Sequence, residues 1–168
     1  MAEGFDGDWL DGYADALLGL ARSLPLDAAA PEPGTVAVVG HLMDRTEPDQ
    51  VGNVTELRRL LGRLGIDVAS VWLDGGDVGG LGAARRASAI ISLPYGRDAA
   101  RVLGMRLSVP VVEAPLPLGT AGTTAFLETV GAGLGLAARA ATVAQEERTE
   151  TLRRIRVHAS CVTAGRAA

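Results

Sequence analysis

Four short apolar runs alternate with segments of helical periodicity, and this alternation restricts the chain to few folds. The runs are residues 35–39, 66–73, 88–92 and 109–114. Thr35–Val39 is a continuous apolar run that ends at a glycine, which is typical of a central strand buried on both faces of a parallel sheet. Right-handed crossovers then place the strands in the order 2-1-3-4. We expect a three-layer, Rossmann-like α/β fold of flavodoxin-like order, with a four-stranded parallel sheet flanked by helices.

Apolar residues at three- and four-residue steps predict the helices. The first begins at Trp9, after Asp8 as N-cap, and ends before Pro25. A capping box at Asn53–Glu56 predicts a second helix that ends before Gly65. Further helices are predicted over 81–86, over 97–107, from residue 123 onward and over 145–158. These elements divide the chain into an N-terminal helix with a proline-rich linker (1–34), a Rossmann-like domain (35–140) and a C-terminal helix and tail (141–168).

Composition argues against several classes of function. The net charge is −4 and no long basic run occurs, so we expect no nucleic-acid partner. Cys161 is the only cysteine, which excludes an internal disulfide and a cluster held by several thiolates of this chain. Charged residues interrupt every apolar run before the ~20 residues that span a bilayer, and the acidic start does not resemble a signal peptide. We expect a cytoplasmic protein with no membrane partner.

The segment Gly40–Gly52 is the principal candidate for function. It connects the first strand to the predicted Asn53 helix and exceeds the roughly 2–6 residues that such a connection usually needs. Ligands of open parallel sheets bind at the carboxyl ends of the strands, where this loop and the segment 93–97 should face each other. The candidate ligand- or partner-binding residues are His41, Asp44, Arg45, Asp49, Asn53, Tyr95, Gly96 and Arg97, and Glu47 belongs to the same charged loop. Taken singly, each is also explained as part of a hydrated rim.

Two of these residues suggest a ligand more directly. Tyr95 is placed to stack on a ligand or to cap a pocket. Arg97 begins a predicted helix, where its charge opposes the helix dipole, which suggests an external anion or carboxylate partner. By contrast, the glycine-rich segment 75–82 fits no phosphate-binding spacing, and no nucleophile elbow occurs. The sequence identifies no catalytic residue and no metal site.

Several short motifs of the chain resemble those of a known family. Gly4–Gly7, followed by Gly12, Tyr13 and Ala16, has the pattern GF-x-G…GY-x-x-A. This pattern resembles the entry into the second Rossmann-like subdomain of the nitrogenase component 1 type oxidoreductases, which include dark-operative protochlorophyllide reductase subunits. Gly52–Ile66 is similar to the family's G-N-x-x-E-L-x-x-L-L…LGI signature. The segments 94–100, 109–110 and 117–127 extend the resemblance, which covers residues 4–155. It implies the central Rossmann-like subdomain of such a subunit.

The resemblance implies an iron–sulfur oxidoreductase whose partners are a homologous nitrogenase-like subunit and an ATP-dependent iron–sulfur reductase. The family's cluster-ligating cysteines have no counterpart here, and Ser92–Tyr95 stands where the catalytic nitrogenase subunit carries a cofactor-ligating cysteine. The iron–sulfur cluster is therefore expected in the complete complex and not on this chain alone. We expect a central domain or fragment, inactive by itself, that adds crevice walls to a metal-cluster or tetrapyrrole site completed by other parts. Self-association through surfaces that further subdomains would cover is also expected.

Two other hypotheses remain open on the sequence. A non-enzymatic binding or assembly module would dock a partner, a tetrapyrrole or a metal complex through the 40–52 loop. A flavodoxin-like nucleotide binder is less well supported, because no phosphate-binding loop follows the first strand. The sequence alone does not decide whether the chain is part of an enzyme.

Overall fold

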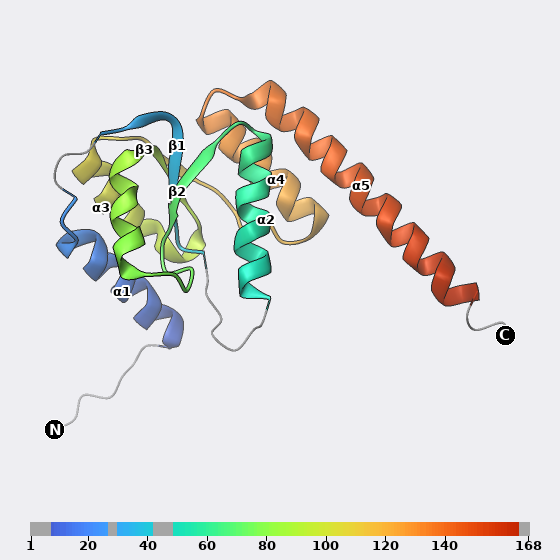
Figure 1. The fold of residues 1–168 in the computed structure, drawn as a ribbon, viewed down its shortest axis with the longest axis horizontal. Coiled ribbons are helices and arrows are strands. Elements are labelled where there is room, and N and C mark those ends of the chain that lie inside the picture. Colours follow the sequence, from blue (N-terminus) through green and yellow to red (C-terminus); the bar gives the residue numbers. More distant parts are fainter. Residues whose placement is uncertain (1–7, 27–29, 42–48, 165–168) are drawn as a thin grey trace.

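The computed structural model describes residues 8–26, 30–41 and 49–164, with side chains as far as residue 157. Helices lie on both faces of a central sheet (Figure 1). The elements, with η for a 3-10 helix, are α1 (Trp9–Ser23), β1 (Glu32–Val39), α2 (Gln50–Arg63), β2 (Asp67–Val71), η1 (Val78–Arg86), β3 (Ala87–Ser92), η2 (Pro94–Gly96), α3 (Arg97–Leu107), β4 (Val111–Glu113), α4 (Gly119–Gly133) and α5 (Ala137–Ala164).

The sheet confirms the predicted fold class. All strand pairs are parallel, and the order is β2-β1-β3-β4. The last residues of the strands pair with one another: Val38 with Val71, Val39 with Ser92, and Ser92 with Glu113. The carboxyl ends of the four strands therefore meet at one edge, where parallel α/β sheets bind their ligands.

Alternate residues of β1 pack into two different cores, because successive side chains of a strand point to opposite faces. Val36 and Val38 belong to the core formed with α2, α4 and α5. Ala37 and Val39 belong to the core formed with α1, η1 and α3. Both faces of the central strand are thus buried, which is why its sequence is apolar without alternation.

The helices with clear local signals begin and end where predicted. The Asp8 side chain accepts hydrogen bonds from the amides of Leu10 and Asp11, and the Asp11 carboxylate accepts one from the Asp8 amide. This capping box starts α1 at Trp9. The helix α3 has its predicted bounds, Arg97–Leu107.

The capping box predicted at Asn53 is wrong, because α2 begins at Gln50. The Asn53 amide donates to the Asp49 carbonyl over 2.9 Å, so Asn53 already lies within the helix. Asp49 is the N-cap, although its side chain caps no backbone amide. Its Oδ2 instead accepts a hydrogen bond from Asn53 Nδ2 at 3.4 Å. The connection after β1 is therefore shorter than the predicted 40–52 loop.

Other boundaries also differ from prediction. The strand β1 begins at Glu32, within the predicted linker, and its register against β3 shifts between Glu32 and Val36. Such an irregularity accommodates a proline and a glycine near the start of a strand. Both β2 and β4 are shorter than predicted, η1 is a 3-10 helix that begins before residue 81, and α4 begins before residue 123.

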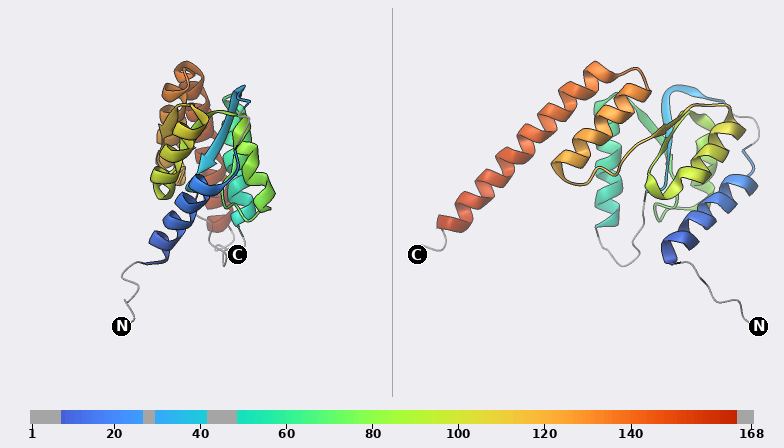
Figure 2. Two further views of the ribbon diagram at one scale, coloured as in Figure 1. Left: turned by 90° about the vertical axis from the view of Figure 1, so that its left-hand side faces the viewer. Right: turned by 180° about the vertical axis from the view of Figure 1, so that it is seen from behind.

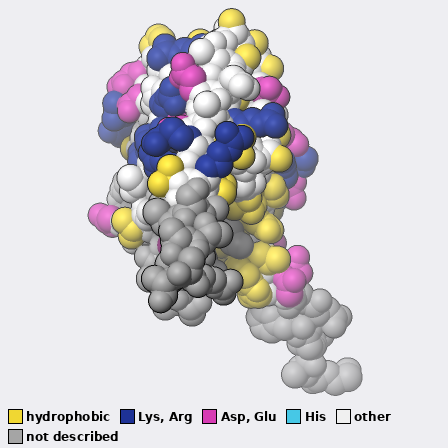
Figure 3. Space-filling model, turned by 90° about the vertical axis from the view of Figure 1, so that its right-hand side faces the viewer, with side chains coloured by type: hydrophobic (Ala, Val, Ile, Leu, Met, Phe, Trp, Pro, Cys, Tyr) yellow, Lys and Arg dark blue, Asp and Glu magenta, His cyan; other side chains and the backbone are white. Residues whose placement is uncertain are grey.

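The helix α5 begins at Ala137, earlier than predicted, packs first against α4, and then projects away from the sheet (Figures 1 and 2). Ion pairs hold it to α2 where it leaves the body: Arg59 and Arg63 both contact Glu147, and Arg63 also contacts Glu146. Figure 3 faces this end of the molecule and shows arginine side chains gathered there. Among the described helices, none combines the length and the apolar character needed to cross a membrane.

Candidate functional site

A hollow lies at the carboxyl edge of the sheet, between α2 and the segment that joins β4 to α4. We call it the edge hollow; its volume is about 330 Å³. It combines apolar side chains with a small number of polar ones, as ligand sites generally do. It is lined by Trp9, His41, Gln50, Asn53, Glu56, Leu57, Leu60, Leu116, Pro117, Leu118 and Thr123.

Two side chains of the edge hollow carry a buried nitrogen for which the described residues offer no hydrogen-bond partner. These atoms are Nδ1 of His41 and Nε2 of Gln50. An unpaired buried polar group costs about 1–3 kcal/mol, and native structures retain few of them. Both residues line the edge hollow. Their buried nitrogens mark this hollow as the candidate binding site.

The surroundings of His41 favour the neutral form of its imidazole. Burial lowers the pKa of His41, and this effect exceeds the opposing influence of the Asp74 charge. A neutral imidazole has one nitrogen that can accept a hydrogen bond or bind a metal ion. His41 can therefore contact either a hydrogen-bond donor or a metal centre.

Tyr13 fixes the backbone of His41. Its hydroxyl donates to the His41 carbonyl over 2.6 Å. Burial raises the pKa of Tyr13 to about 12, so the hydroxyl remains a donor at physiological pH. This bond ties α1 to the chain just beyond β1, and the first helix is therefore part of the support of the site.

The predicted site residues fall into two groups that line different hollows. The segments after β1 and β3 contact each other between these hollows. A Cβ atom placed on Gly96 would lie 2.7 Å from both Cα and N of Gly40. Gly40 and Gly96 therefore lie backbone to backbone, and the residues beside them line different hollows. His41 and Asn53 line the edge hollow. Tyr95, Gly96 and Arg97 line a second hollow of about 220 Å³ between α1 and the start of α3.

Arg97 is engaged by the protein itself. Its Nη1 donates to the Ser92 carbonyl over 2.6 Å, and its Nη2 donates to the Ala114 carbonyl over 3.1 Å. Its Nε lies 3.6 Å from the Glu113 carboxylate. These contacts join the carboxyl ends of β3 and β4. They account for a positive charge at the start of α3 without an external anion, which corrects that interpretation of the sequence.

Of the remaining predicted residues, Asp49 alone belongs to the described part of the chain, and it does not line the edge hollow. Asp49 is exposed at the start of α2 and pairs with Asn53. Asp44, Arg45 and Glu47 lie outside the described residues. Their part in a site stays a prediction.

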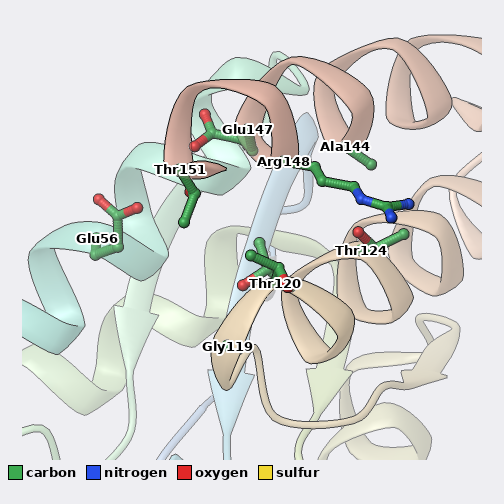
Figure 4. A pocket seen from close by; sticks show the side chains of 9 residues that line it. Glu56, Gly119, Thr120, Thr124, Ala144, Glu147, Arg148 and Thr151 are labelled. Carbon is green, nitrogen blue, oxygen red and sulfur yellow. The ribbon is translucent and has the colours of Figure 1, made fainter. Parts of the chain in front are cut away.

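A third hollow, of about 200 Å³, adjoins the edge hollow between α2, α4 and α5 (Figure 4). Glu56 and Thr123 line both. In Figure 4 the Arg148 side chain extends from α5 toward Thr124 of α4. The third hollow is lined by threonine hydroxyls and by charged side chains, and it continues the edge hollow with a more polar lining.

Of the residues that line the edge hollow, the sequence predicted only His41 and Asn53 as site residues. Leu116–Leu118 could have been found, because this segment follows the fourth strand at the same edge of the sheet. Gln50 belonged to the predicted loop, but nothing in its sequence context distinguished it. Trp9 was assigned to the apolar face of a helix, whereas its side chain is 61% exposed and lines the hollow.

The donor set does not fit an iron–sulfur cluster held by this chain alone. Such clusters are held mainly by thiolates, and the sequence has the single cysteine Cys161. In the described part of the chain, no three His, Cys, Asp or Glu side chains are grouped so as to hold a metal ion. The edge hollow instead combines apolar side chains with the polar side chains of His41 and Gln50.

A four-stranded parallel sheet flanked by helices, with a hollow at its carboxyl edge, defines a Rossmann-like α/β domain. The profile of the nitrogenase component 1 type oxidoreductases matches residues 1–168, and the chain therefore belongs to this family. Its members use iron–sulfur clusters, and membership suggests a multi-subunit complex. No curated protein matched the chain.

Proposed function

We propose that this chain is the central domain of a nitrogenase-like oxidoreductase subunit, and that the edge hollow forms one wall of a metal-cluster or tetrapyrrole site completed by other polypeptide segments. Family membership supports the general class. The observation that carries the proposal is the pair of unpartnered buried nitrogens, on His41 and Gln50, beside one hollow. A homologous subunit and an ATP-dependent iron–sulfur reductase are the proposed partners.

In this proposal the residues of the hollow bind and orient the group. The bound metal centre or tetrapyrrole would supply the electron-transfer chemistry. Leu57, Leu60 and Leu116 exclude water from one side of it. The neutral imidazole of His41 contacts a metal or a donor, and the amide of Gln50 donates to an acceptor. The chain by itself is proposed to be catalytically inactive.

The proposal is tested by titrating the chain with zinc protoporphyrin IX and following the absorbance of the porphyrin. We expect saturable binding at one porphyrin per chain. His41→Ala should weaken binding about tenfold, equivalent to about 1.4 kcal/mol, and Gln50→Ala should also weaken it. Matched controls are His158→Ala and Gln145→Ala, which remove the only other histidine and the only other glutamine.

Three results would contradict the proposal. One is the absence of saturable binding, and another is equal affinity for wild type and His41→Ala. The third is an isolated chain that binds a stoichiometric iron–sulfur cluster and reduces a substrate with dithionite. Porphyrin binding by a chain that purifies from its host without any partner subunit would instead favour the non-enzymatic binding or assembly module.

A further inference from the structure

The projecting part of α5 is basic and carries exposed apolar side chains. Residues 148–157 contain four arginines and one glutamate, a net charge of +3 in a chain whose net charge is −4. Leu152, Ile155 and Val157 are 40%, 57% and 50% exposed. Arginine side chains gather on the face of the molecule from which this helix emerges (Figure 3). Leu152 and Ile155 lie three positions apart on one face of the helix, so the end of α5 is suited to an acidic, partly apolar surface.

The hollow between α1 and α3 has the complementary character. Its lining includes the carboxylates of Asp11 and Asp15 and the apolar side chains of Leu10 and Leu18, with Tyr95 from η2. Asp11 and Asp15 are exposed and lie one helical turn apart, an arrangement in which like charges repel. A cationic partner would relieve that repulsion. We call this surface the acidic groove.

The positive charges near the acidic groove are already engaged. Arg97 contacts the Ser92 and Ala114 carbonyls, and Arg101 lies 2.6 Å from Asp98. By contrast, Asp15 has no ion-pair partner among the residues that the structure describes. The Asp15 carboxylate is thus available to an incoming cation, whereas the Asp11 carboxylate also accepts the Asp8 amide.

The α5 helix of the same molecule does not reach the acidic groove. The helices α1 and α5 lie on opposite sides of the sheet domain, and α5 runs away from α1 in the views of Figures 1 and 2. The complementary surfaces can therefore meet only between two molecules.

We infer that the chain self-associates by docking the basic end of α5 into the acidic groove of a second copy. Leu152 and Ile155 supply apolar contact, and the arginines of 148–157 face Asp11 and Asp15. A polyanionic partner such as nucleic acid or an anionic membrane fits less well, because the rest of the chain carries a net charge of −7 and repels it. Each copy has one helix and one groove, so the contact is heterologous unless two copies exchange helices reciprocally.

Sedimentation velocity over a range of protein concentrations tests this inference with the full chain. Wild type should form concentration-dependent dimers or larger species, and raising the salt from about 0.05 M to about 0.5 M should weaken them. The helix variant carries Leu152→Glu and Ile155→Glu. The groove variant carries Asp11→Asn and Asp15→Arg, where Asn keeps an oxygen that can accept the Asp8 amide. Each variant alone should be a monomer, and Val78→Glu, which changes another exposed apolar residue, should associate like wild type.

Mixing the two variants gives the decisive result, because each retains the half that the other lacks. An equimolar mixture should form a one-to-one dimer that does not grow further. Circular dichroism establishes that both variants are folded. The inference is overturned if wild type stays monomeric at all concentrations, if either variant associates like wild type, or if the mixture stays monomeric. Binding of monomeric wild type to anionic vesicles or to DNA, lost in the helix variant, would likewise overturn it.

Discussion

Gly40 and Gly96 pack backbone against backbone at the carboxyl edge of the sheet, and neither position has room for a side chain. A Cβ on Gly40 would lie 2.7 Å from Gly96 Cα and 2.8 Å from the Leu93 carbonyl oxygen. Gly40 also has a φ of +88°, which glycine adopts readily and other residues rarely do. This contact brings the chain after β1 against the chain after β3 and separates the edge hollow from the acidic groove.

Replacing Gly96 by alanine should therefore destabilise the protein. The new methyl group would meet backbone atoms, which cannot move aside as a side-chain end can, so we expect a loss of about 1–3 kcal/mol. Urea denaturation of wild type and of the Gly96→Ala variant measures this difference in unfolding free energy. Gly62→Ala is the matched control, since a Cβ there meets nothing within 4 Å and alanine favours a helix. Equal stability of the two variants would contradict the close contact.

Tyr13→Phe should lower stability by about 0.5–1.5 kcal/mol, the usual net value of one hydrogen bond. The change removes the bond to the His41 carbonyl and keeps the aromatic ring. Thermal unfolding followed by circular dichroism measures the change. Tyr95→Phe is the control, because the Tyr95 hydroxyl has no hydrogen-bond partner recorded among the described residues. If both variants unfold like wild type, the bond contributes nothing to holding α1.

Arg97→Met should cost about 1–3 kcal/mol, because charge-assisted hydrogen bonds to two buried strand ends are lost. Arg101→Met removes a more exposed arginine of the same helix, and we expect about 0–1 kcal/mol from its ion pairs. Chemical denaturation of both variants provides the comparison. A larger effect at Arg101 would show that Arg97 does not join β3 to β4.

Glu147 should make the stability of the α2–α5 contact depend on pH. Hydrogen bonds from Arg59, together with those from Arg63, lower the pKa of Glu147 below its ordinary value. The stabilisation is therefore complete above the pKa of an unfolded glutamate, about 4.3, and is lost as the pH falls through the lower folded value. Glu147→Gln should cost about 1 kcal/mol or less at pH 7, since Arg59 is 44% exposed and solvent screens the pair.

To test this, the unfolding free energies of wild type and of Glu147→Gln are measured from neutral pH to about pH 3, and the difference between them is followed. The difference should stay constant down to about pH 5 and shrink below it. Glu128→Gln serves as control, because Glu128 is exposed on α4 and has no ion pair within the described ranges. A difference that grows in acid would contradict the sign of the pKa shift.

Local signals predicted those elements whose ends are set by nearby residues. The α1 cap at Asp8 and the bounds of α3 follow from contacts within a few positions of the chain. The start of α2 was misplaced because Asn53 has the residue type of a cap, while the helix continues backward to Gln50. Capping chemistry alone could not distinguish a cap from a position inside the first turns.

The sequence by itself determined the strand order and the parallel sheet, because strand–helix alternation and right-handed crossovers leave few alternatives. Only the tertiary structure decided which side chains meet at the carboxyl edge of the sheet. It brought Gln50 and Leu116–Leu118 beside His41, placed Tyr95 in a different hollow, and gave Arg97 two carbonyl partners within the chain. The physical reason is the separation along the chain of the residues in contact. Periodicity and helix caps depend on residues a few positions apart. The hollows depend instead on packing between distant segments, such as the backbone contact of Gly40 with Gly96.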